Sequence, residues 1–331
     1  VIDCHMDSAM TDEYLEKMRE SGVTAVNLDG GTWERLAEIH KFIDEHRDAL
    51  LGPVTTSVGI SEAKRKGKIA IFVGAENANE SLESRSPPFG AMVSSTNLDF
   101  LLLYHRLGLR ILQPAYNNRN AFADGCAEKV DVGLSNLGLE LIERMNRLSM
   151  IVDCSHVSRR TTLDVCKHAR FVISTHANAR AVCENARNRS DEEIKAIAER
   201  DGVLGMVAFP TFLKWTDTEK GKWPHVEDLL DHVDYIGRLV GTKHVGIGLD
   251  LVEGTDTLGP IVPGKSFISR YPELYGKPGP GGFLRYAEGM NSISDLPNFA
   301  KGLVARGYSD QEVQGVLGEN WLRVFKKAWG E

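Results

Sequence analysis

Short apolar segments rich in branched and aromatic residues recur along the chain, and longer stretches of mixed polarity separate them. Apolar runs of about four to eight residues, bounded by turn-forming residues, are typical of buried β-strands. Eight such segments occur, at residues 1–5, 24–28, 69–74, 109–114, 150–154, 171–175, 203–209 and 244–248. The stretches between them are long enough for helices.

Several of the intervening stretches carry apolar residues at helical spacing. Leu137, Leu141 and Met145, for example, fall on one face. Helices are predicted in this way at residues 135–147, 159–168, 191–200 and 226–240, and residues 294–329 predict two more. Alternating strands and helices form parallel sheets, and eight repeats fit a closed (β/α)₈ barrel better than an open sheet. We therefore expect an α/β fold of the TIM-barrel type, in a single domain of residues 1–331 with C-terminal helices.

Composition places the chain among soluble globular proteins, with 42% hydrophobic and 26% charged residues. The formal net charge of -7 argues against nucleic acid or an anionic membrane as a partner, because both attract basic surfaces. No apolar run approaches the roughly 18–20 residues that span a bilayer, and no leader-like segment precedes the first predicted strand. We expect a cytoplasmic protein. The five cysteines are irregularly spaced, which is not typical of a disulfide framework.

Candidate chemistry begins at the end of the first predicted strand, where His5 and Asp7 stand two residues apart. Alternate residues of a strand face the same side, so both side chains should project together, and both types are good metal ligands. A hydrogen-bonded His–Asp pair would give the same pattern. Glu76 follows the third apolar run. A carboxylate there is costly unless it is paired or binds metal, although a loop carboxylate facing water is the simpler interpretation.

His156 and His176 each follow an apolar run, and their separation of about one β/α repeat gives them equivalent positions on neighbouring strands. Each alone would more often be a structural histidine. Together with His5, Asp7 and Glu76 at the same end of the barrel, they make a good ligand set for two cations. The eighth run ends at Asp250, which could accept a proton from a water or cap the next helix. The irregular segments 77–95 and 252–289 also follow strand ends, where barrels carry active-site loops.

These residues stand in segments that resemble the membrane (renal) dipeptidase family of binuclear zinc peptidases. The resemblance runs over nearly the whole chain and is carried by VIDCHMD, GAENANE, MIVDCSHVS, FVISTHANARAVCENARN, KHVGIGLD and GYSDQEVQGVLGENWLRVF. It implies a (β/α)₈ fold related to the amidohydrolases, a small dipeptide-like substrate, and often a homodimer.

The resemblance also implies two zinc ions per chain, and manganese or cobalt would suit the same ligands. His5 and Asp7 would hold one ion. His156 and His176 would hold the other, and Glu76 would bridge both.

For catalysis, the resemblance implies that Asp250 orients the metal-bridging water and carries its proton to the leaving amine. Arg187 would bind the terminal carboxylate of the substrate, a task that suits a planar guanidinium. Tyr116 stands where family dipeptidases usually carry a histidine that contacts the scissile carbonyl, and a phenol can also donate a hydrogen bond there.

The function predicted from the sequence is hydrolysis of the amide bond of a dipeptide or dipeptide-like molecule through a metal-bridging hydroxide. Tyr116 and the poorly matched loop after Asp250 leave two alternatives. One is a hydrolase with the same site that acts on another small amide or a lactam. The other is a non-hydrolytic lyase or decarboxylase on the same barrel.

Overall fold

The structure is a computed structural model that describes residues 1–84, 95–214, 223–253, 271–275 and 286–331. The chain falls into two compact units. Unit 1 comprises residues 1–26 and 174–323, and unit 2 comprises residues 27–173 and 324–331. The expectation of a single domain over residues 1–331 stays a prediction.

Unit 1 contains the first strand and the last two strands of the chain. β1 (Ile2–Met6) pairs in parallel with β11 (Val245–Ile247), which pairs in parallel with β10 (Leu204–Met206). β2 (Ala25–Asp29) crosses the boundary between the units. The longer helices are α1 (Asp12–Glu20), α8 (Asp191–Glu199), α10 (Val226–Val240) and α13 (Leu296–Ala305). The shorter ones are α9 (Pro210–Leu213), η2 (Thr242–His244), α12 (Pro272–Tyr275), η3 (Ile293–Asp295), α14 (Asp310–Gln314) and η4 (Gly315–Glu319).

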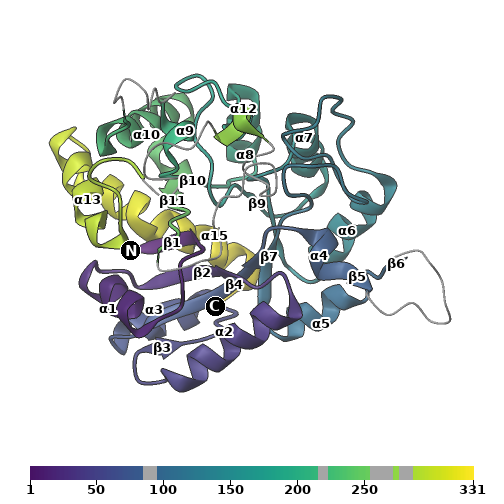
Figure 1. Ribbon diagram of the computed structural model, residues 1–331, viewed down its shortest axis with the longest axis horizontal. Coiled ribbons are helices and arrows are strands. Elements are labelled where there is room, and N and C mark those ends of the chain that lie inside the picture. The colour runs from purple at the N-terminus through teal and green to yellow at the C-terminus, as the bar shows by residue number, and fades with distance from the viewer. Residues whose placement is uncertain (85–94, 215–222, 254–270, 276–285) are drawn as a thin grey trace. The chain divides into compact units, whose positions relative to one another are not determined.

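Unit 2 contains four strands paired in parallel, in the order β4 (Ile69–Ala75), β7 (Leu109–Leu112), β8 (Ile151–Asp153) and β9 (Val172–Ile173). A short β3 (Leu50–Leu51) pairs with β4, and β5 (Glu83–Ser84) pairs antiparallel with β6 (Ser95–Thr96). The helices are α2 (Trp33–Glu45), α3 (Ser57–Arg65), α4 (Ala78–Leu82), α5 (Phe100–Arg106), α6 (Asn136–Arg147) and α7 (Arg159–His168) (Figure 1). The last helix, α15 (Asn320–Trp329), begins in unit 1 and ends in unit 2.

The eight predicted strands are all present, as β1, β2, β4, β7, β8, β9, β10 and β11. The helices predicted at residues 159–168 and 226–240 have the predicted bounds, as α7 and α10. The C-terminal prediction of two helices is incomplete, because the second one is divided into α14, the π-helical η4 and α15. Most of the irregular segment 252–289 and part of 77–95 lie outside the described residues.

Local sequence explains where these helices begin. Ser135, Ser158 and Ser190 each precede a helix, and each side chain accepts a hydrogen bond from a backbone N–H of the first turn. At α8, the Glu193 side chain accepts in return from the Ser190 N–H, which completes a capping box. These caps set the helix starts that follow β7, β8 and β9, and so limit the lengths of the loops at the carboxyl ends of these strands.

In the part of the chain that the structure describes, no helix is both long and apolar enough to cross a bilayer. The five cysteines, all within the described residues, form no disulfide bond, as the sequence predicts.

Candidate active site

In unit 1, the predicted site residues of β1 and β11 lie together. His5 is the penultimate residue of β1. Its side chain is 2% exposed, and its Nε2 lies 3.8 Å from Asp7 Oδ2 and 3.6 Å from Asp250 Oδ1. One nitrogen or oxygen atom from each of the three side chains lies within 4.8 Å of the others. Asp7 and Asp250 are more exposed than His5, so the group opens from a buried histidine toward solvent.

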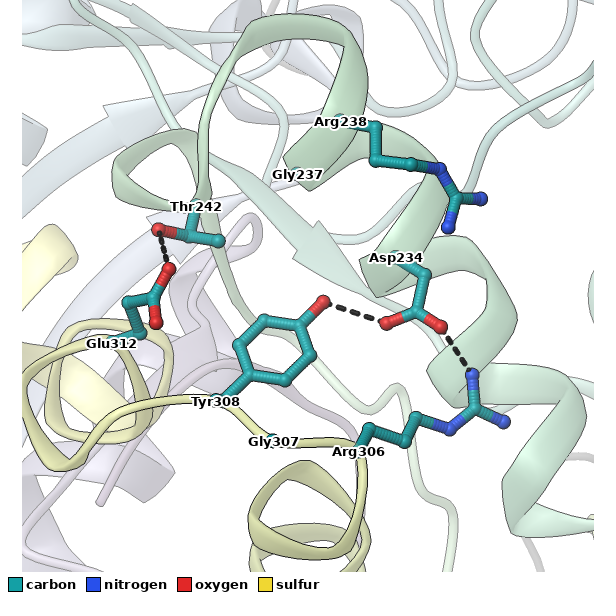
Figure 2. A pocket seen from close by; sticks show the side chains of 8 residues that line it. All are labelled: Asp234, Gly237, Arg238, Thr242, Arg306, Gly307, Tyr308 and Glu312. Atoms are coloured by element: carbon teal, nitrogen blue, oxygen red, sulfur yellow. Dashed lines mark hydrogen bonds and ion pairs between the residues drawn. The ribbon is translucent and has the colours of Figure 1, made fainter.

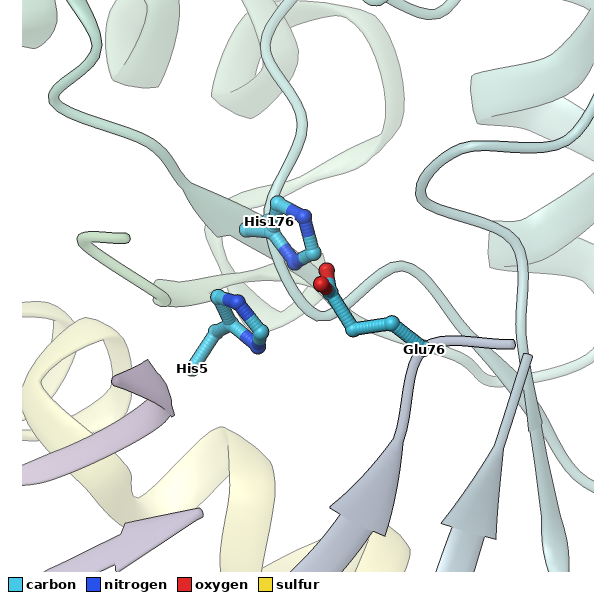
Figure 3. Close-up of side chains that lie close together, drawn as sticks. All are labelled: His5, Glu76 and His176. Atoms are coloured by element: carbon cyan, nitrogen blue, oxygen red, sulfur yellow. The ribbon is translucent and has the colours of Figure 1, made fainter. Parts of the chain in front are cut away.

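His176 joins the same group from the segment after β9. Its ring stacks on the His5 ring with centroids 3.9 Å apart (Figure 3). Its Nδ1 lies 2.8 Å from Thr175 Oγ1, a contact that orients the ring. The Thr175 carbonyl oxygen packs closely against Gly205 and Gly248. A Cβ at these two positions would lie 1.9 and 1.8 Å from this oxygen, so only glycine fits there.

The electrostatics of this group centre on two carboxyls, the buried Asp3 and the partly exposed Asp250. Burial raises the pKa of Asp250 to about 6, against the lowering effect of the His5 charge. Burial also raises the pKa of Asp3 to about 6, although Asp3 Oδ1 accepts hydrogen bonds from the backbone N–H groups of Leu249 and His5. A carboxyl with a pKa near 6 can exchange a proton close to neutral pH, as a general acid or base must.

Arg187 is buried in unit 1, with 1% of its surface exposed. Its guanidinium carbon lies 5.2 Å from the centre of the Phe212 ring, and its charge acts on the pKa of Asp250. The backbone on either side is held by Asn185, which accepts from the Arg187 N–H, and by Arg189, which donates to the Arg187 carbonyl. The arginine is therefore in a fixed place near Asp250, and is not the solvated loop residue that its sequence context alone would favour.

In unit 2, the strand ends bring Glu76 and His156 together. Glu76 follows β4 (Figure 3), and its Oε1 lies 3.1 Å from His156 Nε2. The other ring nitrogen, Nδ1, lies 2.9 Å from Asn117 Oδ1, which can only accept. His156 therefore carries its proton on Nδ1 and points Nε2 at the carboxylate. The Glu76 N–H donates to Asp29 Oδ1, at the end of β2.

Tyr116 lies beside this pair, with its ring stacked on the His156 ring at 4.0 Å between centroids. Its phenol thus belongs to the same end of the strands as Glu76. Asn117, which was not among the predicted site residues, adopts a left-handed backbone (φ 56°) and orients His156. Two features of the sequence could have pointed to Asn117. It directly follows Tyr116, a predicted site residue, and asparagine tolerates the left-handed conformation.

The pairing of donor atoms fits a metal ion. Zinc–ligand distances of about 2.0–2.1 Å in a tetrahedron place two ligand atoms about 3.3 Å apart. The separation of 3.1 Å between His156 Nε2 and Glu76 Oε1 is close to this value, and that of 3.8 Å between His5 Nε2 and Asp7 Oδ2 is somewhat longer. Imidazole nitrogens and carboxylate oxygens are also the ligands that zinc, manganese and cobalt accept.

A separate cavity of about 290 Å³ in unit 1 has none of these residues in its lining (Figure 2). Arg306 Nη1 lies 2.7 Å from Asp234 Oδ2, and the Tyr308 hydroxyl donates to Asp234 Oδ1. Thr242 Oγ1 donates to Glu312. These bonds tie α10 to the segment that follows α13, and η2 to α14, so we interpret this charged cluster as structural.

Comparison with known proteins identifies the fold class. An amidohydrolase from Pseudomonas aeruginosa is 29% identical, with a TM-score of 0.83 over 100% of this chain and 97% of that one. A metallopeptidase from Rhodobacter sphaeroides, solved with a phosphinate mimic of the dipeptide L-Ala-D-Ala, is 20% identical, with a TM-score of 0.73 over 95% of this chain and 90% of that one. The predicted fold class is confirmed: a (β/α)₈ barrel of the metal-dependent, amidohydrolase-like type.

The family follows from the sequence comparison. Residues 30–277 and 279–329 match the family model described as membrane dipeptidase, peptidase family M19. Dipeptidase verJ of Clonostachys rogersoniana is 30% identical over 296 residues, 88% of this chain and 64% of that protein. The chain belongs to the membrane dipeptidase family, as the sequence resemblance indicated. It spans between 52% and 64% of the length of the curated relatives that it matches.

Proposed function

We propose that this protein is a zinc-dependent dipeptidase that hydrolyses the amide bond of a dipeptide or dipeptide-like molecule. The observation that carries the proposal is the group of His5, Asp7, His176 and Asp250 at the strand ends of unit 1. Membership of the M19 family supports it, because the group contains the residue types that a metal-dependent hydrolase needs.

We propose further that two cations bind per chain. His5 and Asp7 would hold one, and His156 and His176 would hold the other, with Glu76 shared between them. The proposal is supported by the donor types and by the separations within each unit. When bound, the two cations would lower the pKa of a shared water and so supply a hydroxide nucleophile near neutral pH.

Asp250 would act as the proton carrier of the reaction. Its Oδ1 lies 3.6 Å from His5 Nε2, on the side of the group that opens toward solvent, where it can accept a proton from the attacking water and release it to the leaving nitrogen. His5 lies close enough to orient this carboxyl.

Arg187 and Tyr116 would bind the substrate. The buried guanidinium of Arg187 would hold the terminal carboxylate through two parallel hydrogen bonds. The Tyr116 hydroxyl would donate a hydrogen bond to the carbonyl oxygen as negative charge develops on it. Since charge recognition is lost when the carboxylate is blocked, free dipeptides should be better substrates than their esters.

Tyr116 also favours a second candidate function, hydrolysis of a different small amide or a lactam at the same site. The Tyr116 ring stacks on the His156 ring. Its hydroxyl lies farther from the backbone than the nitrogens of the histidine that family dipeptidases usually carry there, so the shape of the substrate pocket differs. A substrate without a free carboxylate would be indifferent to Arg187→Ala, which separates this function from the first.

The test is metal analysis of the purified chain, followed by hydrolysis assays on a panel of L,L- and L,D-dipeptides and cyclic amides. We expect about two zinc, manganese or cobalt ions per chain and turnover of free dipeptides. Asp250→Asn should retain the metal and lose activity by about a hundredfold or more. An Asp250→Asn protein with full activity would refute the mechanism. Product formation without ¹⁸O from solvent water would instead indicate a lyase or decarboxylase.

A further inference from the structure

Asp250 has an unusual backbone for a residue with a side chain. Its φ is 56°, in the left-handed region, which few residues other than glycine adopt. Such conformations persist only where the surrounding structure holds them, and they gather at functional sites. The direction of the Asp250 carboxyl therefore depends on what fixes the backbone here.

Strand β1 holds the peptide groups on the amino-terminal side of Asp250. The Leu249 N–H donates to Asp3 Oδ1 at 2.9 Å, and the Asp250 N–H donates to the His5 carbonyl at 3.2 Å. The second bond continues the pairing of β11 with β1, and the pairing goes on to Leu251, whose carbonyl accepts from the Asp7 N–H at 3.4 Å and from the Ser8 hydroxyl at 2.8 Å. These bonds hold residues 249 to 251 through other groups than the carbonyl of residue 250 and the N–H of residue 252.

Tyr286 holds the peptide groups on the carboxyl-terminal side. Its hydroxyl donates to the Asp250 carbonyl at 2.6 Å and accepts from the Val252 N–H at 3.1 Å. One oxygen atom thus bridges the carbonyl of residue 250 and the N–H of residue 252 across the left-handed turn. A neutral phenol can do both, because it has one proton to donate and lone pairs to accept.

The surroundings of Tyr286 keep this hydroxyl in place. The side chain is 2% exposed, and its ring meets the Phe209 ring edge-on, with centroids 6.3 Å apart. The Trp223 indole donates to the Tyr286 carbonyl at 2.6 Å. Burial raises the pKa of the phenol well above its usual value, so the hydroxyl keeps the proton that it donates to Asp250.

We propose that Tyr286 is a positioning residue for Asp250: its hydroxyl bridges the left-handed turn and so sets the direction of the catalytic carboxyl toward His5. The proposal rests on the proposed function of Asp250 as proton carrier. Tyr286 acts through the backbone of Asp250 and takes no part in the proton transfer. Its effect should therefore fall on the chemical step and leave substrate binding nearly unchanged.

The test is Tyr286→Phe in the full chain loaded with zinc, which removes the hydroxyl and keeps the ring against Phe209. With a dipeptide that the wild type hydrolyses, we expect kcat to fall by about tenfold to a hundredfold, as for a displaced catalytic group, and KM to change by less than about twofold. The matched control is Tyr275→Phe, because Tyr275 packs edge-on against the same Phe209 ring. It should leave kcat unchanged.

A double-mutant cycle shows whether Tyr286 acts through Asp250. In an Asp250→Asn background the Tyr286→Phe substitution should have no further effect on kcat. An equal loss in both backgrounds would overturn the proposal, since it would make the tyrosine a structural residue only. A Tyr286→Phe protein with wild-type kcat would overturn it as well.

A crystal structure of Tyr286→Phe gives a readout that does not depend on activity. We expect residue 250 to leave the left-handed region, or its carboxyl to move away from His5. An unchanged Asp250 would overturn the proposal. If the wild type hydrolyses none of the amides tested while Asp250 moves in the variant, the proposed function fails and the positioning role of Tyr286 stands.

Discussion

The pKa of Asp3 leads to a quantitative prediction for the stability of the metal-free protein. Burial raises this pKa to about 6 from the usual 3.8, and backbone hydrogen bonds from Leu249 and His5 only partly oppose the rise. Asp3→Asn removes the titration and keeps both the size of the side chain and an acceptor oxygen. The substitution therefore isolates the cost of ionising one carboxyl in this environment.

The direction of the effect follows from proton binding. Between pH 4 and pH 6 the folded protein keeps the Asp3 proton that the unfolded chain has already released. Raising the pH through this range therefore lowers stability. One pKa unit corresponds to 1.36 kcal/mol, so the difference between 3.8 and about 6 amounts to about 3 kcal/mol by pH 7.

Urea unfolding at pH 4 to 7 in the presence of a chelator measures this difference. The free energy of unfolding of Asp3→Asn minus that of the wild type should become more positive by about 2.4 kcal/mol between pH 4 and pH 7, because the unfolded carboxyl is already partly ionised at pH 4. Asp124→Asn is the control with a nearly flat profile over this range: burial raises the pKa of Asp124, but the Arg119 guanidinium and the Val132 N–H outweigh it and lower the pKa overall, so its titration lies below about pH 4. Parallel pH profiles for Asp3→Asn and the wild type would refute the reasoning.

Three further substitutions test packing, charge and recognition. Gly248→Ala should destabilise the protein by about 1–3 kcal/mol in thermal unfolding, because its Cβ would lie 1.8 Å from the Thr175 carbonyl oxygen; an unchanged Tm would contradict this. Arg189→Met should cost about 3–5 kcal/mol in urea unfolding, since it strands the buried carboxylate of Glu193, 3.0 Å away. Replacing both residues by Met should recover most of that loss. Arg187→Ala should raise KM for free dipeptides by about tenfold or more and leave KM for their methyl esters unchanged, whereas equal effects on both substrates would exclude carboxylate recognition.

Strands and helices were predictable where the pattern of apolar residues was long enough to have a period. α7 and α10 have the predicted bounds for this reason. β3 and the β5–β6 hairpin have strands of two residues each, too short for alternation to be recognised. The division of the last helix near Gly318, where φ is 167°, depends on packing against Ile2, whose side chain would contact a Cβ at this glycine. A contact between opposite ends of the chain leaves no local signal.

Some site residues were predictable from the sequence and others were not, because their roles place different demands on the side chain. His5 and Asp250 could be proposed from their type and from their place at a strand end, because metal binding and proton transfer require particular side-chain atoms. Asp3 and Tyr286 contribute by accepting from or donating to peptide groups of residues 249–252, a task that many polar side chains can perform. Tyr286 is also separated from Asp250 by more than thirty positions of the chain. Since a backbone hydrogen bond places no demand on sequence spacing, such residues emerge only when the folded chain brings them to the turn that they hold. A variant that keeps every predicted site residue can therefore still lose activity, if it changes a residue that holds the backbone of a site residue in place.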